Sequence, residues 1–195
     1  MNRTVIVTGI PGSGKTTVCS CVEKFAKSAG VEVNVINYGT VMMGLLEKHG
    51  KDMERDEMRK DSLGTQRKLQ KEVAGVIVEK MKQMRGLMIV DTHMSINTRA
   101  GYLPGLPSHS LSVLKPVMLV LVEAEPREIS RRRMKDSTRK RDAALEETVI
   151  EELLFSRLMA GASAVLAGAP VKIVINAEGK QEEAAKEILE ALEVA

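Results

Sequence analysis

The chain has 195 residues, of which 44% are hydrophobic and 28% charged, proportions typical of folded globular proteins rather than disordered or fibrous ones. This length predicts a single domain over residues 1–195. The net charge of +3 is too small by itself to predict nucleic-acid binding. Aromatic residues are scarce, with two Tyr, two Phe and no Trp against twelve Met, so a bound base finds few rings to stack on.

Short β-branched runs alternate with longer helical patterns along the whole chain, which is typical of a parallel sheet with crossover helices. We expect strands at 4–8, 32–36, 87–91, 116–122 and 171–175. We expect helices at 15–29, 38–48, 63–84, 126–135, 142–166 and 181–192, with Asp142 as the N-cap of the fifth. The pattern predicts a three-layer α/β fold, in which a five-stranded parallel sheet carries helices on both faces.

Two features bear on location. Cys19 and Cys21 stand two apart in an expected helix, where their side chains point in different directions, so neither a disulfide nor a shared metal is expected. The chain start lacks the apolar length of a secretory signal, and the longest apolar run, 116–122, is far short of a membrane span. We expect a soluble, reduced, cytoplasmic protein with no membrane partner.

The strongest local pattern follows the first expected strand, where the chain reads GIPGSGKTT. It matches the G-x-x-x-x-G-K-[ST] pattern of a phosphate-binding loop between a strand and a helix. Backbone N–H groups wrap the phosphates, Lys15 reaches the β and γ phosphates, and Thr16 offers a hydroxyl to Mg²⁺. The pattern predicts a P-loop NTPase fold and an ATP-phosphate site formed by Gly9, Ile10, Pro11, Gly12, Ser13, Gly14, Lys15, Thr16 and Thr17.

The third expected strand ends in a carboxylate, Asp91, after four apolar residues. In P-loop proteins a strand-end acid holds Mg²⁺, so Thr16 and Asp91 are the predicted metal residues, and Mg²⁺ with ATP is the predicted cofactor. The alternative is an aspartate that caps the next loop. A P-loop alone does not separate GTPases, motor ATPases and small-molecule kinases.

Basic residues cluster between Arg127 and Arg141, with eight Lys or Arg against two acids. A kinase needs such cations around the transferring phosphoryl group, and it must close over its substrates to exclude water. Two charged segments, 49–61 and 136–142, stand where lids would close over a site; solvated surface helices are the alternative. The cluster could instead bind RNA phosphates, but it is short and lacks interleaved aromatics, so nucleic acid is not the expected partner.

Longer stretches carry a resemblance to a known family. The segments NYG at 37–39, RDEMRK at 55–60, DTHMSINTRAGYLPGLP at 91–107 and STRKRD at 137–142 resemble the archaeal adenylate kinases, which are P-loop nucleoside monophosphate kinases. The similarity spans nearly the whole chain, and GYLPGLP is far more specific than the P-loop. It implies reversible phosphoryl transfer from MgATP to AMP giving two ADP, an AMP-binding insert that includes 49–61, a short lid at 136–142, and a homotrimer.

The resemblance also implies roles for single residues. Arg59 would meet the AMP phosphate, and Arg139 and Arg141 would close on the transferring group beside Lys15. One or more of Arg131, Arg132 and Arg133 would flank the ATP adenine or phosphates, and Arg132 and Arg133 are the two assigned to ATP. The implied catalytic residues are Lys15, Arg59, Arg139 and Arg141. The implied acceptor-binding residues are Tyr38, Gly39, Arg59, His93 and Arg99.

The sequence departs from the bacterial adenylate kinase pattern after the second and third strands. Met43 stands where that pattern has an Arg, and Asp91 is followed by Thr-His-Met-Ser in place of Gly-x-Pro-Arg. Asn97 stands where archaeal relatives are expected to carry a basic residue, which leaves Arg99 as the substitute. Acceptor recognition is therefore the part of the resemblance with the least sequence support.

Two side chains after Asp91 have more than one interpretation. His93 could touch substrate phosphate, orient Asp91 or brace its own loop, and Tyr102 could pack the loop or stack on a base. The sequence as a whole predicts an adenylate kinase. The alternatives are a P-loop kinase for another small acceptor, and an adenylate-kinase-like ATPase that assists RNA or ribonucleoprotein assembly.

Overall fold

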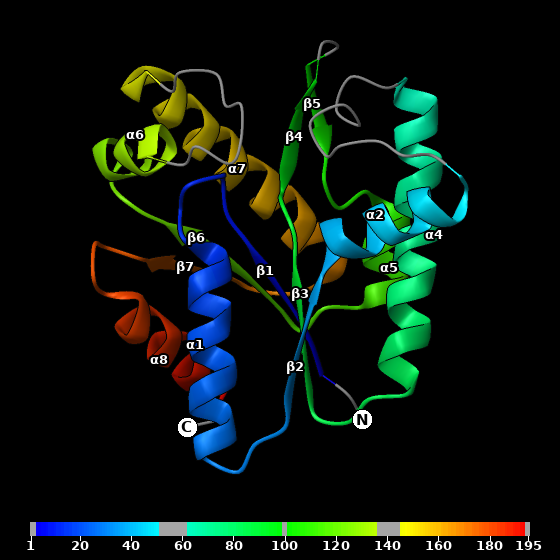
Figure 1. Cartoon of the computed structure of the whole chain (residues 1–195), viewed down its shortest axis with the longest axis horizontal. Helices are drawn as coiled ribbons and strands as arrows, with labels where there is room; N and C mark the ends of the chain where they lie inside the picture. The colour runs from blue at the N-terminus through cyan, green and yellow to red at the C-terminus, as the bar shows by residue number, and fades with distance from the viewer. Residues whose placement is uncertain (1–2, 51–61, 99–100, 136–144, 194–195) are drawn as a thin grey trace.

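A computed structural model describes residues 3–50, 62–98, 101–135 and 145–193. Five strands form one parallel sheet in the order β2-β3-β1-β6-β7 (Figure 1). They are β1 (Arg3–Thr8), β2 (Val33–Asn37), β3 (Leu87–Asp91), β6 (Met118–Glu123) and β7 (Val171–Ile175). The predicted five-stranded parallel sheet is confirmed, and no strand end differs from its predicted position by more than two residues.

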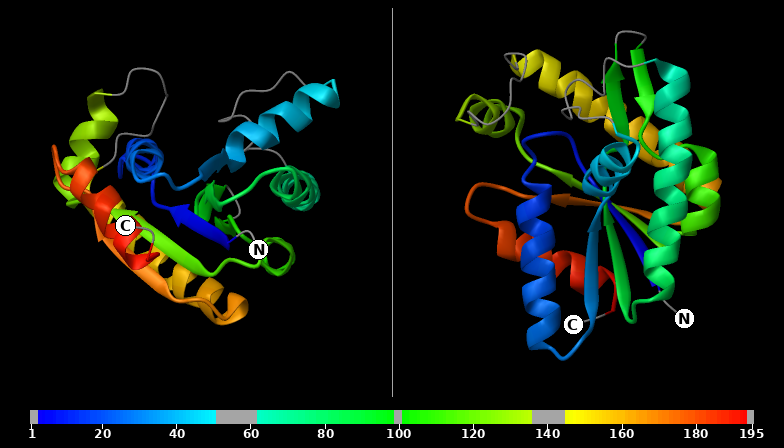
Figure 2. Two further views of the ribbon diagram at one scale, coloured as in Figure 1. Left: turned by 90° about the horizontal axis from the view of Figure 1, so that it is seen from below. Right: turned by 45° about the vertical axis from the view of Figure 1, so that its right-hand side comes forward.

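Helices cover both faces of this sheet (Figure 2). One face packs against α1 (Lys15–Ser28) and α8 (Gln181–Ala191). The other packs against α4 (Leu63–Lys82), α5 (Ser108–Leu114) and α7 (Glu146–Ala167), with α2 (Tyr38–Lys48) set against α4. The short helix α6 (Pro126–Lys135) packs on the first turns of α7. The three-layer α/β arrangement is thus as predicted.

The central strands are apolar without interruption because both of their faces are buried. In β1, Val5 and Val7 point toward α1 and α8, whereas Ile6 between them points toward α4 and α7; all three are fully buried. Neighbouring side chains of a strand alternate between faces, so one short run supplies both hydrophobic cores. A shift of one residue would move each of these side chains to the other face of the sheet, so their burial fixes the register of the strands. In this register the carboxyl ends of the strands lie at one edge of the sheet.

Three elements were not predicted. The hairpin of β4 (Ser95–Thr98) and β5 (Gly101–Pro104) and the helix α5 all fall between the third and fourth predicted strands. The Gly and Pro residues of GYLPGLP favour a loop by propensity, yet Tyr102 of β5 stacks on Phe155 of α7, with ring centroids 4.1 Å apart and planes 22° apart. This long-range contact, together with the pairing of β4 with β5, holds the segment as a hairpin.

One predicted helix start is wrong. The helix before β7 begins at Glu146 with Leu145 as its N-cap, and Asp142, the predicted N-cap, lies outside the described residues. Glu146 and Glu147 lie in the first turn, where carboxylates are favoured by the helix dipole. The expected insert 49–61, apart from His49 and Gly50, and the whole expected lid 136–142 lie outside the described residues.

Candidate functional site

The carboxyl ends of all five parallel strands meet at one edge of the sheet, which is where open α/β sheets bind ligands. In register, Val7 of β1 lies beside Asp91 of β3, and Asp91 lies beside Asn37 of β2. The loop that follows β1 begins two residues after Val7. The topology therefore brings the glycine-rich loop, Asp91 and Asn37 together although 82 residues separate Gly9 from Asp91 along the chain.

The loop from Gly9 to Gly14 turns tightly into α1. Gly12 and Gly14 have φ of +90° and +80°, a left-handed conformation that side chains with a Cβ rarely adopt. A Cβ on Gly9 would collide with the carbonyl of Val122 and the hydroxyl of Ser13, and one on Gly14 would collide with Asn176. The glycines are thus required by the packing of the loop itself, and the loop leads into the N-terminus of α1, where Thr16 and Thr17 are exposed.

Lys15 and Asp91 form an ion pair next to this loop. Both side chains are buried, with exposed fractions of 8% and 2%, and the second oxygen of Asp91 accepts a hydrogen bond of 2.8 Å from the Asn37 amide. Asn37 is also the N-cap of α2, because its Oδ1 accepts from the backbone N–H of Thr40 at 2.9 Å. One amide thereby fixes both the carboxylate and the start of the next helix.

His93 braces the loop. Its Nδ1 lies 2.9 Å from the carbonyl oxygen of Gly9, so of the roles open from the sequence, the structure shows the loop-bracing contact. Tyr102 likewise packs against Phe155. Both residues therefore make protein contacts that hold the segment after β3 in place.

Two arginines of α6 donate hydrogen bonds to carbonyl groups of the glycine-rich loop. Arg132 donates to the carbonyls of Gly12 and Ser13 at 3.4 and 3.3 Å and to that of Asn176 at 3.1 Å. Arg133 is buried, donates to the carbonyl of Pro11 at 2.7 Å, and pairs with Glu152 of α7 at 2.5 Å. Sequence reasoning placed both arginines at ATP, and the structure places both at the loop that ATP phosphates would occupy.

Asn176, which sequence reasoning missed, holds the glycine-rich loop through a side-chain hydrogen bond. It follows β7, is 4% exposed, and donates from Nδ2 to the carbonyl of Ser13 at 2.8 Å. Its backbone N–H donates to the carbonyl of Glu123 at 2.7 Å. No motif marks a single Asn 163 residues away from its partner; only its place directly after a strand could have suggested it.

A second missed residue is Glu123, the last residue of β6. Its carboxylate is 3% exposed and receives two hydrogen bonds from Arg157 of α7, at 2.8 and 2.5 Å. This contact and the charge of Glu123 raise the pKa of the Arg157 guanidinium above its ordinary value. The pair ties the end of β6 to α7 next to the residues that hold the loop.

Other predicted site residues divide into two groups. Tyr38 is buried, and its hydroxyl donates to the backbone carbonyl of Gln70 at 2.8 Å, while Gly39 lies in the first turn of α2 and is half-buried. Arg59, Arg99, Arg139 and Arg141 lie outside the described residues. The structure therefore brings together the P-loop, Asp91, His93, Arg132 and Arg133. The arginines predicted to bind the acceptor are assigned from the sequence alone.

The donor set at this edge fits Mg²⁺. The Asp91 carboxylate and the Thr16 hydroxyl are hard oxygen ligands of the kind that Mg²⁺ prefers, and Mg²⁺ normally keeps waters and takes substrate phosphates. Across the residues that the structure describes, no group of three or more His, Cys, Asp or Glu side chains could hold a metal by itself. A metal here would be shared between these residues and a nucleotide. In the same described residues, no helix is long and apolar enough to cross a membrane.

Comparison with known proteins gives three results. The model of a family described as AAA domain matches residues 8–150. A shikimate kinase from Acinetobacter baumannii in complex with shikimate has a TM-score of 0.62 and 15% identity, with 98% of this chain and 93% of that chain covered. The Deinococcus radiodurans tunicamycin resistance protein also reaches a TM-score of 0.62, at 12% identity, with 100% and 98% covered. At such identities the structures show a shared fold alone.

Curated relatives share much more sequence. An adenylate kinase from Saccharolobus solfataricus is 45% identical over 190 residues, which is 96% of this chain and 97% of that protein. An adenylate kinase from Methanocaldococcus jannaschii is 40% identical over 191 residues, 98% of each. With a confirmed P-loop NTPase fold and similarity of this extent, the chain belongs to the archaeal adenylate kinase family.

Proposed function

We propose that the protein transfers a phosphoryl group reversibly from MgATP to AMP, giving two ADP. The observation that carries this is the constellation at the carboxyl edge of the sheet: a P-loop whose Lys15 meets Asp91, held in place by Arg132, Arg133 and Asn176. Membership of a family whose curated members are named adenylate kinase supports the acceptor.

The described residues would work by position and charge. The P-loop backbone and Lys15 bind the ATP phosphates and stabilise the charge on the transferring group. His93 and Asn176 hold the loop through the carbonyls of Gly9 and Ser13, so little of the binding energy is lost in ordering it. No side chain needs to form a covalent bond with the phosphoryl group.

Mg²⁺ belongs to the proposal as the partner of ATP. Thr16 and Asp91 would hold it, and when bound it supplies positive charge against the phosphate oxygens. Lys15 pairs with Asp91 in the structure, so the carboxylate already lies among the phosphate-binding residues.

The acceptor side rests on residues that the structure does not describe. We propose that Arg59 positions the AMP phosphate, that Arg139 and Arg141 close on the transferring group, and that Arg99 serves in place of the basic residue expected at Asn97. Tyr38 and Gly39 would form the wall of the AMP site at the start of α2. In this arrangement residues 1–195 form one domain, with the AMP insert around 49–61 and the lid at 136–142.

The proposal includes a homotrimer in the cytoplasm that does not bind nucleic acid. The surface of α7 supports self-association, because Leu154, Leu158 and Val165 are 56%, 71% and 85% exposed. Two free thiols, Cys19 and Cys21, suit a reducing compartment. Three described arginines of the basic cluster that suggested RNA binding have partners within the protein: Arg131 pairs with Glu178, and Arg132 and Arg133 bond to the P-loop.

The Lys15→Met variant tests the assignment. We expect turnover of MgATP with AMP to fall by about three orders of magnitude or more, because the main cation at the phosphates is lost. Since this change also leaves Asp91 buried without its cation, the double variant Lys15→Met with Asp91→Asn keeps the site neutral and serves as a stability control. Near-normal turnover in a folded Lys15→Met protein would remove the basis of the proposal.

A further inference from the structure

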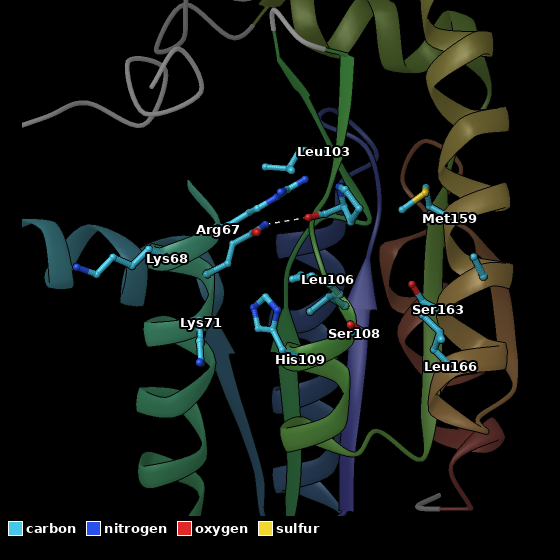
Figure 3. A pocket seen from close by; sticks show the side chains of 14 residues that line it. Arg67, Lys68, Lys71, Leu103, Leu106, Ser108, His109, Met159, Ser163 and Leu166 are labelled. Carbon is cyan, nitrogen blue, oxygen red and sulfur yellow. Dashed lines mark hydrogen bonds between the residues drawn. The ribbon is translucent and has the colours of Figure 1, made fainter. Parts of the chain in front are cut away.

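A cavity of about 610 Å³ lies on the face of the sheet that carries α4, α5 and α7 (Figure 3). Its walls come from α4, from the segment between β5 and α5, and from the second half of α7. None of its lining residues belongs to the P-loop, to Asp91 or to the arginines of α6. It is therefore separate from the phosphate-binding loop and from the residues that contact it.

The lining is apolar in the middle and basic on one side. Leu103, Leu106, Met159 and Leu166 supply apolar surface. Arg67 extends from α4 toward Leu103, as Figure 3 shows, and Lys71 lies one turn further along the same helix. No lining residue is acidic. An anionic group would thus meet cations at this wall, whereas a cationic ligand would meet only like charge.

Buried polar atoms inside the lining lack partners. Gln70 is 1% exposed; its Nε2 donates to the carbonyl of Pro104 at 2.8 Å, but its Oε1 has no hydrogen-bond partner within the described ranges. The Nε2 of His109, which also lines the cavity, is buried and without a partner in the same ranges. Leaving such atoms unpaired costs about 1–3 kcal/mol each, and native proteins generally satisfy them. Both atoms are closed off from the open space of the cavity, so a ligand there would reach them only after a side chain turns.

We propose that this cavity is a second small-molecule site, which takes an amphiphilic anion. The ligand has an apolar body that packs between Leu106 and Met159, and a carboxylate, sulfonate or phosphate that pairs with Arg67. A fatty carboxylate belongs to this class. The proposal does not depend on the reaction at the P-loop.

The fluorescent anion 8-anilinonaphthalene-1-sulfonate tests the site, because it combines an apolar ring system with a sulfonate. Titrated into the full chain with saturating MgATP present, it should bind saturably at one molecule per chain. Loss of that binding on addition of MgATP would place the probe at the P-loop and overturn the proposal.

Matched variants locate the bound probe. Ala162→Phe fills the cavity and should weaken binding at least 10-fold, whereas Val113→Phe, an exposed position on α5 outside the lining, should change it less than 2-fold. Arg67→Glu should also weaken binding at least 10-fold, and Lys80→Glu, on α4 but outside the lining, should not. Equal affinity in Ala162→Phe and Val113→Phe would contradict the assignment.

Competition identifies the site of the probe. Displacement by decanoate supports the proposal, whereas displacement by AMP would place the probe at the acceptor site of the proposed reaction and would overturn it. Displacement by inorganic phosphate at the same concentration would show a surface charge patch in place of a cavity site. Loss of probe binding as the chain self-associates would show that a second copy fills the cavity, and this too would overturn the proposal.

Discussion

Single residues at this site make packing contacts and hydrogen bonds that the sequence motifs do not indicate. Gly14 completes the P-loop pattern, yet what forbids a side chain there is the amide of Asn176 and a φ of +80°. The same amide bonds the Ser13 carbonyl. The phosphate-binding loop is thus held in shape by a residue that follows β7, a strand at the edge of the sheet.

Asn176→Asp tests this support. A carboxylate of the same shape cannot donate to the Ser13 carbonyl and adds negative charge below the phosphates, so we expect the KM for ATP to rise about 10-fold and stability to fall by about 1–3 kcal/mol. Asn34→Asp is the control, since Asn34 makes a side chain to carbonyl bond of the same 2.8 Å length at an exposed position. An unchanged KM in Asn176→Asp would show that the loop does not need this bond.

The two cysteines should differ in reactivity. Burial raises the pKa of Cys19 to about 11 although the positive charge of Lys15 opposes the shift, whereas Cys21 is half-buried. We expect a thiol reagent at pH 8 to modify one thiol per native chain, at Cys21, because only the thiolate reacts. Modification of both thiols at equal rates would contradict this.

The same shift makes stability depend on pH. The folded state keeps the Cys19 proton up to about pH 11 while the unfolded chain loses it near 9.0, so stability is complete below pH 9 and falls as pH rises toward 11, by up to ~2–3 kcal/mol. Cys19→Ala should flatten this fall in chemical unfolding, and Cys21→Ala should not.

At the scale of elements, the sequence predicted the strands and turns that are defined by neighbouring residues. Uninterrupted apolar runs such as 87–91 identify buried strands, and GIPGSGKTT marks the turn from β1 into α1. The hairpin of β4 and β5 was missed because its fold depends on Tyr102 meeting Phe155, 53 residues later. Asn176 and Glu123 were missed for the same reason: each is defined by a partner distant in sequence.

The pair of Glu123 and Arg157 is the most consequential of these distant contacts for stability. Arg157→Ala leaves a carboxylate that is 3% exposed without its cation, and we expect a loss of about 2–3 kcal/mol, less than for a fully buried pair because Arg157 is half-exposed. Arg127→Ala, which breaks an exposed pair with Glu146, should cost under about 1 kcal/mol. Equal losses in the two variants, measured by chemical unfolding, would show that burial of Glu123 does not matter.

At the scale of the whole molecule, one side of the fold exposes apolar surface. Ile173 and Ile175 of the edge strand β7 are 41% and 51% exposed, and they share a face of that strand with Val171, which packs on the α7 side. Leu158 of α7 is 71% exposed as well, and exposed apolar side chains of this kind are what subunit interfaces cover.

Leu158→Glu tests the proposed trimer. Charge in this apolar surface should convert the trimer to monomers in sedimentation or light-scattering measurements, because a buried unpaired carboxylate opposes association. Val113→Glu, an exposed apolar position on α5, is the control and should leave the trimer intact. A trimer that persists in Leu158→Glu would exclude this surface as the interface.

Every role proposed for these residues depends on transfer of the phosphoryl group to AMP. Incubation of the protein with MgATP and AMP, with ATP, AMP, ADP and inorganic phosphate followed together, tests this transfer. One ATP and one AMP should disappear for every two ADP formed, without release of phosphate. Formation of ADP and inorganic phosphate with AMP unchanged would contradict it and would indicate an ATPase.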